Sequence, residues 1–201
     1  SRWKTNQFSA QPAISELART LSLRRVTPLN DFAAQAHALP VLGPADLFQF
    51  GGGTEVAGAP KVVLGPGTGL GAAALVQIDG RWHAITGEGG HVTMAPSDER
   101  EARIIALGRE RYGHCSAERL ISGAGLAFLY LALHGGEQLT PDEVVTRIAR
   151  GEAAALEALD VFFQLLATAA SNLALTFSAF GGVYIGGGVT PRYLEQLKTS
   201  G

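Results

Sequence analysis

Apolar residues recur every three or four positions in several stretches of the chain, the spacing that places them on one face of a helix. Residues 13–23 show this stripe, and the alanine-rich residues 32–39 are compatible with a second helix. Further helices are predicted after four polar residues that suit a helix start: Ser97, Ser116, Thr140 and Thr190. Residues 152–179 are predicted to form a long apolar helix at the centre of the fold.

Shorter apolar runs, each bounded by turn residues, are typical of strands. They occupy residues 24–29, 61–64, 72–78, 81–86 and 183–185. A glycine loop and the turn Asp79-Gly80 separate the three middle runs, which predicts a β-meander, and the last run has the composition of a buried strand. Strands mixed with helices indicate an α/β protein, and the loop-rich residues 41–60 place a candidate domain boundary near residue 41.

Composition narrows the classes of function. The chain has 201 residues, of which 46% are hydrophobic and 17% charged, enough for one large or two small globular domains. A formal charge of −2 without a basic cluster argues against a nucleic-acid partner. Residues 161–180 carry too many polar side chains for a membrane span, so no membrane partner is expected. The single Cys115 excludes an internal disulfide and a Cys-rich zinc site, fits a reducing, cytoplasmic setting, and is expected to be a small buried apolar residue.

The segment Gly87-Glu88-Gly89-Gly90-His91-Val92 combines hydrogen-bonding side chains with glycine. Glycine allows the backbone to approach a ligand closely, so this pattern is compatible with a polar small-molecule pocket at the mouth of a sheet. A glycine-rich surface turn with an exposed Glu88 and His91 fits the local sequence equally well.

A second glycine-rich segment, Gly65-Pro66-Gly67-Thr68-Gly69-Leu70-Gly71, lies between two predicted strands. It fails the dinucleotide fingerprint because a strand and not a helix follows it, and it lacks the lysine of a P-loop. Successive backbone N–H groups and the Thr68 hydroxyl could still bind phosphate oxygens. A plain turn is the alternative.

Two further acidic residues and one further glycine segment are chemical candidates. Asp31 follows a predicted strand and precedes a predicted helix, where an aspartate can act as a base, bind a metal or simply cap the helix. Glu118 lies in the first turn of a predicted helix, where glutamate commonly offsets the helix dipole. Gly186, Gly187 and Gly188 end the last predicted strand and leave bare backbone against which an adenine ring could lie.

Five motifs occur in an order and at a spacing that resemble the bacterial glucokinase family. They are Asn30-Asp31-Phe32; Gly65-Pro66-Gly67-Thr68-Gly69-Leu70-Gly71; Glu88-Gly89-Gly90-His91; Ser116-Ala117-Glu118-Arg119 followed by Ser122-Gly123; and Gly181-Gly182-Val183-Tyr184-Ile185-Gly186-Gly187-Gly188 with Pro191-Arg192. The resemblance covers nearly the whole chain. It implies an actin-like ATPase (ribonuclease H-like) fold, with residues 1–40 as a remnant of the small α/β domain and residues 41–201 as most of the large one.

The resemblance also implies an activity, the ATP-dependent phosphorylation of the glucose 6-hydroxyl that begins glycolysis. Asp31 matches the general base. Asn30, Glu88, His91 and Glu118 match the residues that bind glucose hydroxyls. Gly67, Thr68 and Gly69 match a phosphate-binding turn, and Gly186, Gly187 and Gly188 match the adenosine end of the site. Mg²⁺ is expected on the ATP, with no protein ligand for it identifiable, and a homodimer is compatible with the family.

The chain departs from the family at both ends, because a full member has an Asp-x-Gly-Gly-Thr hairpin before this segment and further helices after it. We therefore expect an internal fragment with uncertain activity of its own. A non-catalytic sugar-binding or regulatory module on the same fold, and a kinase for another hexose, are the alternative functions.

Overall fold

A computed structural model describes residues 11–24 and 26–200. The chain divides into two compact units, residues 1–31 and residues 32–201. The predicted domain boundary near residue 41 remains a prediction.

The first unit contains helix α1 (Gln11–Thr20), as the apolar stripe of residues 13–23 predicts. The strand expected at residues 24–29 is wrong for the part that is described, since residue 24 is a bend and residues 26–30 have no regular structure. Leu29 is 52% exposed. A strand is held by hydrogen bonds to a neighbouring strand, and no strand of the described sheet pairs with this segment.

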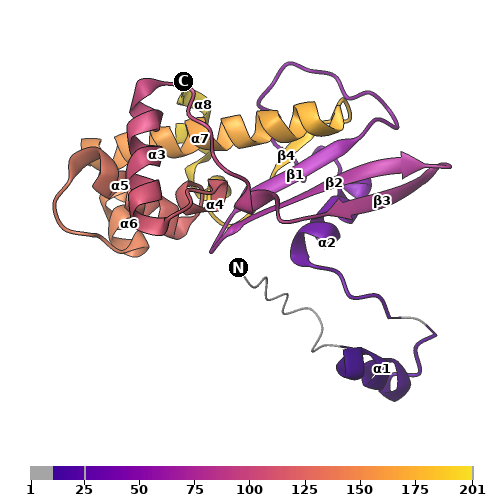
Figure 1. The fold of residues 1–201 in the computed structure, drawn as a ribbon. Coiled ribbons are helices and arrows are strands. Elements are labelled where there is room, and N and C mark those ends of the chain that lie inside the picture. Colours follow the sequence, from indigo (N-terminus) through magenta and orange to yellow (C-terminus); the bar gives the residue numbers. More distant parts are fainter. Residues whose placement is uncertain (1–10, 25, 201) are drawn as a thin grey trace. The chain divides into compact units, whose positions relative to one another are not determined.

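A four-stranded sheet forms the framework of the second unit, in the order β3-β2-β1-β4 (Figure 1). Strand β2 (Leu70–Ile78) pairs antiparallel with both β1 (Lys61–Pro66) and β3 (Arg81–Thr86), which confirms the meander. The turn between β2 and β3 has positive φ angles at Asp79 (49°) and Gly80 (76°), the conformation that an Asp-Gly hairpin adopts readily. Strand β4 (Val183–Ile185) returns parallel to β1.

Helices cover both faces of this sheet (Figure 1). Helix α2 (Asp31–Ala38) places Phe32 and Ala36 against Val63 and Leu75 of the sheet. The long helix α7 (Ala153–Phe177) packs on the other face and buries its first half, from Ala155 to Leu166. By length and apolar composition alone α7 could cross a membrane, but that test is also passed by the buried core helix of a globular protein.

The remaining helices gather with α7 around the main core, which extends from Leu64 to Tyr193. They are α3 (Glu99–Tyr112), α4 (Ala117–Leu120), α5 (Gly123–His134), α6 (Pro141–Ala149) and α8 (Leu194–Thr199), with 3₁₀ turns η3 (Gly89–His91) and η4 (Thr190–Tyr193). A further 3₁₀ turn, η2 (Leu39–Val41), follows α2 and buries Leu39 in the cluster of Phe32 and Leu75. Asp98, and not the predicted Ser97, caps α3 by accepting from the Glu101 N–H. The Glu101 carboxylate in turn accepts from the N–H and hydroxyl of Ser97.

Lys61, the first residue of β1, links the loop before β1 to β4 through hydrogen bonds. Its side chain is buried, and its Nζ donates to Glu55 Oε1 at 2.5 Å, to the Gly181 carbonyl at 3.1 Å and to the Tyr184 hydroxyl at 3.2 Å. Burial opposes the charge on this amine, but the hydrogen bonds and charges of Glu55 and Tyr184 outweigh burial and raise the pKa of Lys61.

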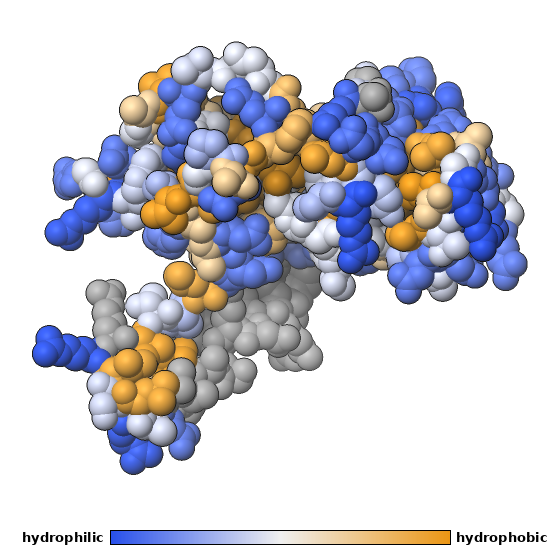
Figure 2. Space-filling model, turned by 180° about the vertical axis from the view of Figure 1, so that it is seen from behind, coloured by the Kyte–Doolittle hydropathy of each residue, from blue (hydrophilic) through white to orange (hydrophobic). Residues whose placement is uncertain are grey.

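The predicted burial of β4 is wrong, because Val183 is 40% exposed and the other two residues are only partly buried. β4 is the edge strand of the described sheet, so one of its sides has no neighbouring strand there. An apolar groove of about 500 Å³ adjoins it, lined by Phe48, Phe50, α7, β4 and α8. Hydrophobic surface is visible among the polar residues of this unit in Figure 2.

Candidate functional site

The turn Gly67-Thr68-Gly69 joins β1 to β2 and closes with a hydrogen bond from the Gly67 N–H to the Gly69 carbonyl at 2.8 Å. Thr68 lies exposed at its tip. Gly71, at the start of β2, lies against the Phe32 ring and leaves no room for a side chain. The turn therefore presents backbone and one hydroxyl to its surroundings.

The corner between α4 and α5 holds this turn at both ends. The Gly123 N–H donates to the Gly67 carbonyl at 3.0 Å, and the Leu70 N–H donates to Glu118 Oε2 at 3.0 Å. The Glu118 carboxylate fills the space that a Cβ of Gly69 would need. A side chain at position 69 would therefore displace the Glu118 carboxylate.

The glycines after β4 lie beside the same turn. The Gly186 N–H donates to the Leu64 carbonyl at 2.8 Å, and the Gly65 Cα packs on the backbone of Gly186 and Gly187. Gly187 has a φ of +83° and approaches the Pro66 carbonyl. The structure therefore brings together the two glycine segments that the sequence predicts for the nucleotide.

Glu88, His91 and Glu118 converge next to the turn. His91 Nε2 lies 3.8 Å from Glu88 Oε2, and His91 Nδ1 lies 3.8 Å from Glu118 Oε1. Both distances exceed that of a hydrogen bond, so the three groups face one another without hydrogen-bonding each other. Their side chains are 73%, 49% and 32% exposed, respectively, and remain accessible from solvent.

The glycines of the Glu88–His91 segment fix its position on the sheet. Residues Gly89–His91 form the 3₁₀ turn η3, in which the His91 N–H donates to the Glu88 carbonyl at 2.9 Å. Gly90 is buried directly against the Leu70 carbonyl, where a side chain would collide. Close backbone approach is therefore the physical reason for glycine at position 90.

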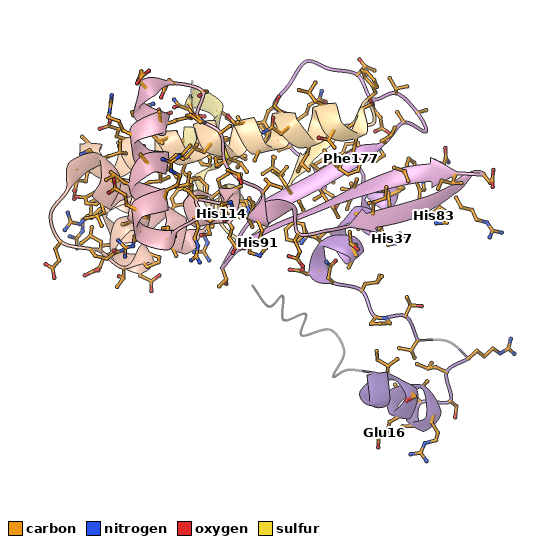
Figure 3. All side chains as sticks on the ribbon, viewed as in Figure 1. Glu16, His37, His83, His91, His114 and Phe177 are labelled. Carbon is orange, nitrogen blue, oxygen red and sulfur yellow. The ribbon has the colours of Figure 1, made fainter. Side chains whose placement is uncertain are left out.

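Two residues that the sequence did not single out, Thr93 and His114, connect the loops that carry His91 and Glu118. Thr93 pairs with Ser116 in an isolated antiparallel bridge, and Thr93 Oγ1 lies 2.9 Å from His114 Nε2. Figure 3 shows His91 and His114 toward the helical end of the sheet, with His83 toward the opposite end. No local pattern marks these residues, because their partners are about twenty positions away.

Cys115, between these loops, is 1% exposed. Burial raises the pKa of its thiol, against an opposing effect of Arg109 and Arg119. This burial confirms its predicted role as a small apolar core residue.

Asn30 and Asp31 belong to the first unit, and Asp31 is the first residue of α2. The described residues before Asp31, 26–30, form no strand. Their grouping with Glu88, His91 and Glu118 remains a prediction. Within residues 11–24 and 26–200, no three His, Cys, Asp or Glu side chains are grouped in a way that could hold a metal ion.

Comparison with known proteins gives the family. The sequence model of the Glucokinase family matches residues 6–201. A glucokinase of Yersinia enterocolitica is 44% identical over 195 residues, which are 94% of this chain and 60% of that protein. The chain thus spans about 60% of the length of this relative.

Solved structures agree on the fold. The crystal structure of a glucokinase from an Antarctic psychrotroph has a TM-score of 0.87 and 33% sequence identity, over 93% of this chain and 60% of that one. A ROK family glucokinase from Streptomyces griseus, solved in complex with glucose and AMPPNP, has a TM-score of 0.54 and 17% identity over 94% of this chain and 61% of that one, and shows a shared fold. The fold is the actin-like ATPase fold of these sugar kinases, as the motifs predict. The chain belongs to the glucokinase family.

Proposed function

We propose that the full-length protein containing this chain transfers a phosphoryl group from ATP to the 6-hydroxyl of glucose. The observation that carries the proposal is the convergence of Glu88, His91 and Glu118 beside the Gly67-Thr68-Gly69 turn. Family membership supports the same reaction. The proposal includes a cytoplasmic location. It also assigns residues 1–40 to a small domain and residues 41–201 to a large one.

The three convergent side chains suit a sugar. Carboxylates accept hydrogen bonds from hydroxyl groups, and a neutral imidazole can accept through one nitrogen and donate through the other. With about 3.8 Å between His91 and each glutamate, the group offers several hydrogen-bonding atoms to adjacent hydroxyls. In this proposal Asn30 supplies a further contact from the first unit.

The glycine segments suit a nucleotide. The Gly67-Thr68-Gly69 turn would bind phosphate oxygens through the Thr68 and Gly69 N–H groups and the Thr68 hydroxyl, since the Gly67 N–H donates within the turn. The bare backbone of Gly186–Gly188 would lie along the adenosine. The close packing of Gly65 against Gly186 and Gly187 fits one continuous surface for this ligand. The bound ATP supplies the phosphoryl group, and Mg²⁺ would enter on its phosphates.

Asp31 is the proposed general base, accepting the proton of the 6-hydroxyl as that oxygen attacks. Its place at the first turn of α2 leaves the carboxylate at a helix N-terminus, exposed to solvent. The role comes from the match of Asn30-Asp31 to the family motif.

The experiment that tests the proposal uses the full-length protein with Asp31→Asn. Removal of a general base lowers kcat by roughly 10²- to 10⁴-fold, whereas glucose affinity measured by calorimetry should change little, because asparagine keeps the size and an acceptor oxygen. Asp79→Asn, in the hairpin between β2 and β3, is the matched control and should keep normal turnover. Near-normal turnover of the Asp31 variant would remove this residue from the base role.

The same assays separate the alternatives. Glucose binding by the parent protein without ATP turnover would support a non-catalytic sugar-binding module. Preferential turnover of another hexose in a competition assay would change the substrate but not the reaction type. Absence of both binding and turnover would contradict the proposed function.

A further inference from the structure

The Glu118 carboxylate contacts two functional segments at once. Its Oε2 accepts the Leu70 N–H at the end of the glycine turn, and its Oε1 faces His91 Nδ1 at 3.8 Å. We propose that Glu118 is a positioning residue for the phosphate-binding turn and that it couples sugar binding to nucleotide binding. This inference rests on the proposed function.

The Leu70 amide depends on this carboxylate. Leu70 is the first residue of β2 and is buried, and its partner across the ladder is Pro66. The Pro66 carbonyl accepts instead from the Val189 N–H at 3.2 Å. A buried backbone N–H needs an acceptor, and Glu118 Oε2 is the one that Leu70 has.

The main core anchors the segment that carries this carboxylate. Leu120 and Ile121, which follow it, are fully buried in the main core. The absence of a side chain at Gly69 gives the carboxylate its space. A shift of Glu118 would therefore move the end of the turn, which is already held at its start by the Gly123 N–H.

The sugar side of Glu118 is attached to the same framework. The Ala117 N–H donates to the Val92 carbonyl at 2.9 Å, and the Met94 N–H donates to the Cys115 carbonyl at 3.1 Å. Gly90 rests on the Leu70 carbonyl. The Leu70 N–H thus contacts Glu118, and the Leu70 carbonyl contacts the segment that carries His91.

Coupling follows from this geometry. A sugar hydroxyl that donates to Glu118 Oε1 fixes the carboxylate whose other oxygen fixes the turn. Each ligand then binds to a site that the other has already ordered, and the effect must be equal in both directions. Glucose should tighten the binding of an ATP analogue by about fivefold or more, and the analogue should tighten glucose binding by the same factor.

The test measures binding of glucose and AMPPNP, each alone and in the presence of the other, by calorimetry on the full-length protein. Glu118→Ala removes the acceptor of the Leu70 N–H. It should weaken the binding of AMPPNP in the absence of glucose by about tenfold and abolish the coupling between the two ligands. Glu118→Gln keeps an acceptor oxygen and should retain AMPPNP affinity. His91→Gln is the matched control, since it should weaken glucose binding without changing the affinity for AMPPNP measured in the absence of glucose.

The Leu70 amide provides a readout that does not depend on turnover. In ¹⁵N-labelled protein the Leu70 amide resonance should shift when glucose is added. In the Glu118→Gln variant without glucose, this resonance should differ from that of the parent protein without glucose. An unchanged Leu70 resonance in that variant, or AMPPNP binding by Glu118→Ala as tight as in the parent, would overturn the positioning role. Failure of the parent protein to bind glucose would instead contradict the proposed function, and the Leu70 shift between variants would still decide the role of Glu118.

Discussion

Gly187 and Gly188 are neighbours after β4 that differ in whether a side chain fits. Gly187 has a φ of +83°, and a Cβ there would collide with the Pro66 carbonyl. Gly188 has no atoms within 4 Å of the position of a Cβ. The strict need for glycine in this segment therefore falls on one residue of the pair.

Gly187→Ala should lower the free energy of unfolding by about 2 kcal/mol or more, because it adds left-handed backbone strain to a steric clash with β1. The measurement is urea unfolding followed by circular dichroism. Gly188→Ala is the control, and its unfolding free energy should stay within about 0.5 kcal/mol of the parent value. Equal effects of the two substitutions would contradict the packing seen between β1 and the glycines.

Helix α6 begins with a capping box, as the segment Thr140-Pro141-Asp142-Glu143 predicts. The Thr140 hydroxyl accepts from the Glu143 N–H, and the Glu143 carboxylate accepts from the Thr140 N–H at 2.7 Å. The backbone hydrogen bond from Thr140 lowers the pKa of Glu143 below its ordinary value. Val144 and Ile148, on the inner face of the helix, are buried in the main core.

Thr140→Ala should destabilise the protein by about 1 kcal/mol, the usual cost of losing an N-cap side chain. Urea unfolding of the variant measures this cost. Gln138→Ala, two residues earlier in the exposed loop, should change stability by less than about 0.5 kcal/mol. A Thr140 variant as stable as the Gln138 variant would mean that core packing alone holds the start of α6.

A polar network joins three helices of the larger unit. Glu152 lies directly before α7. The Tyr130 hydroxyl of α5 donates to Glu152 Oε1 at 2.9 Å, and Arg147 Nη1 of α6 lies 3.1 Å from the same oxygen. The hydrogen bond from Tyr130 lowers the pKa of Glu152 below its ordinary value, and Arg147 adds to this effect. Burial raises the pKa, but by less than the hydrogen bond from Tyr130 lowers it.

A carboxylate whose pKa is lower in the folded state stabilises the protein above its unfolded pKa, near 4.5, and loses this contribution as the pH falls through the folded pKa. Glu152→Gln should therefore reduce stability at pH 7 and flatten the decline of stability between pH 5 and 3. Urea unfolding across this pH range gives the comparison. The control is Glu137→Gln in the exposed loop after α5, and a Glu152 variant with the same pH dependence as the parent would contradict the role of this pair.

Much of the larger unit could be predicted from local patterns. Alternating turns and apolar runs between residues 61 and 86 predict the meander, and the capping residues Ser116 and Thr140 predict the starts of α4 and α6. The strand at residues 24–29 and the burial of β4 were wrong, because both depend on which strand lies alongside. The roles of Asn30 and Asp31 remain predictions, since they concern the other unit.

The sequence by itself determined the family, the β-meander, the helix starts and the candidate site residues, because capping, turn chemistry and glycine motifs are local properties of the chain. The tertiary structure decided which of these residues meet. Glu118 shows the difference: its sequence position indicates only a favourable charge at a helix start, whereas packing of α4 against the turn makes its carboxylate the acceptor for Leu70 and a neighbour of His91. Contacts over such sequence distances depend on the packing of whole elements, which no local pattern contains.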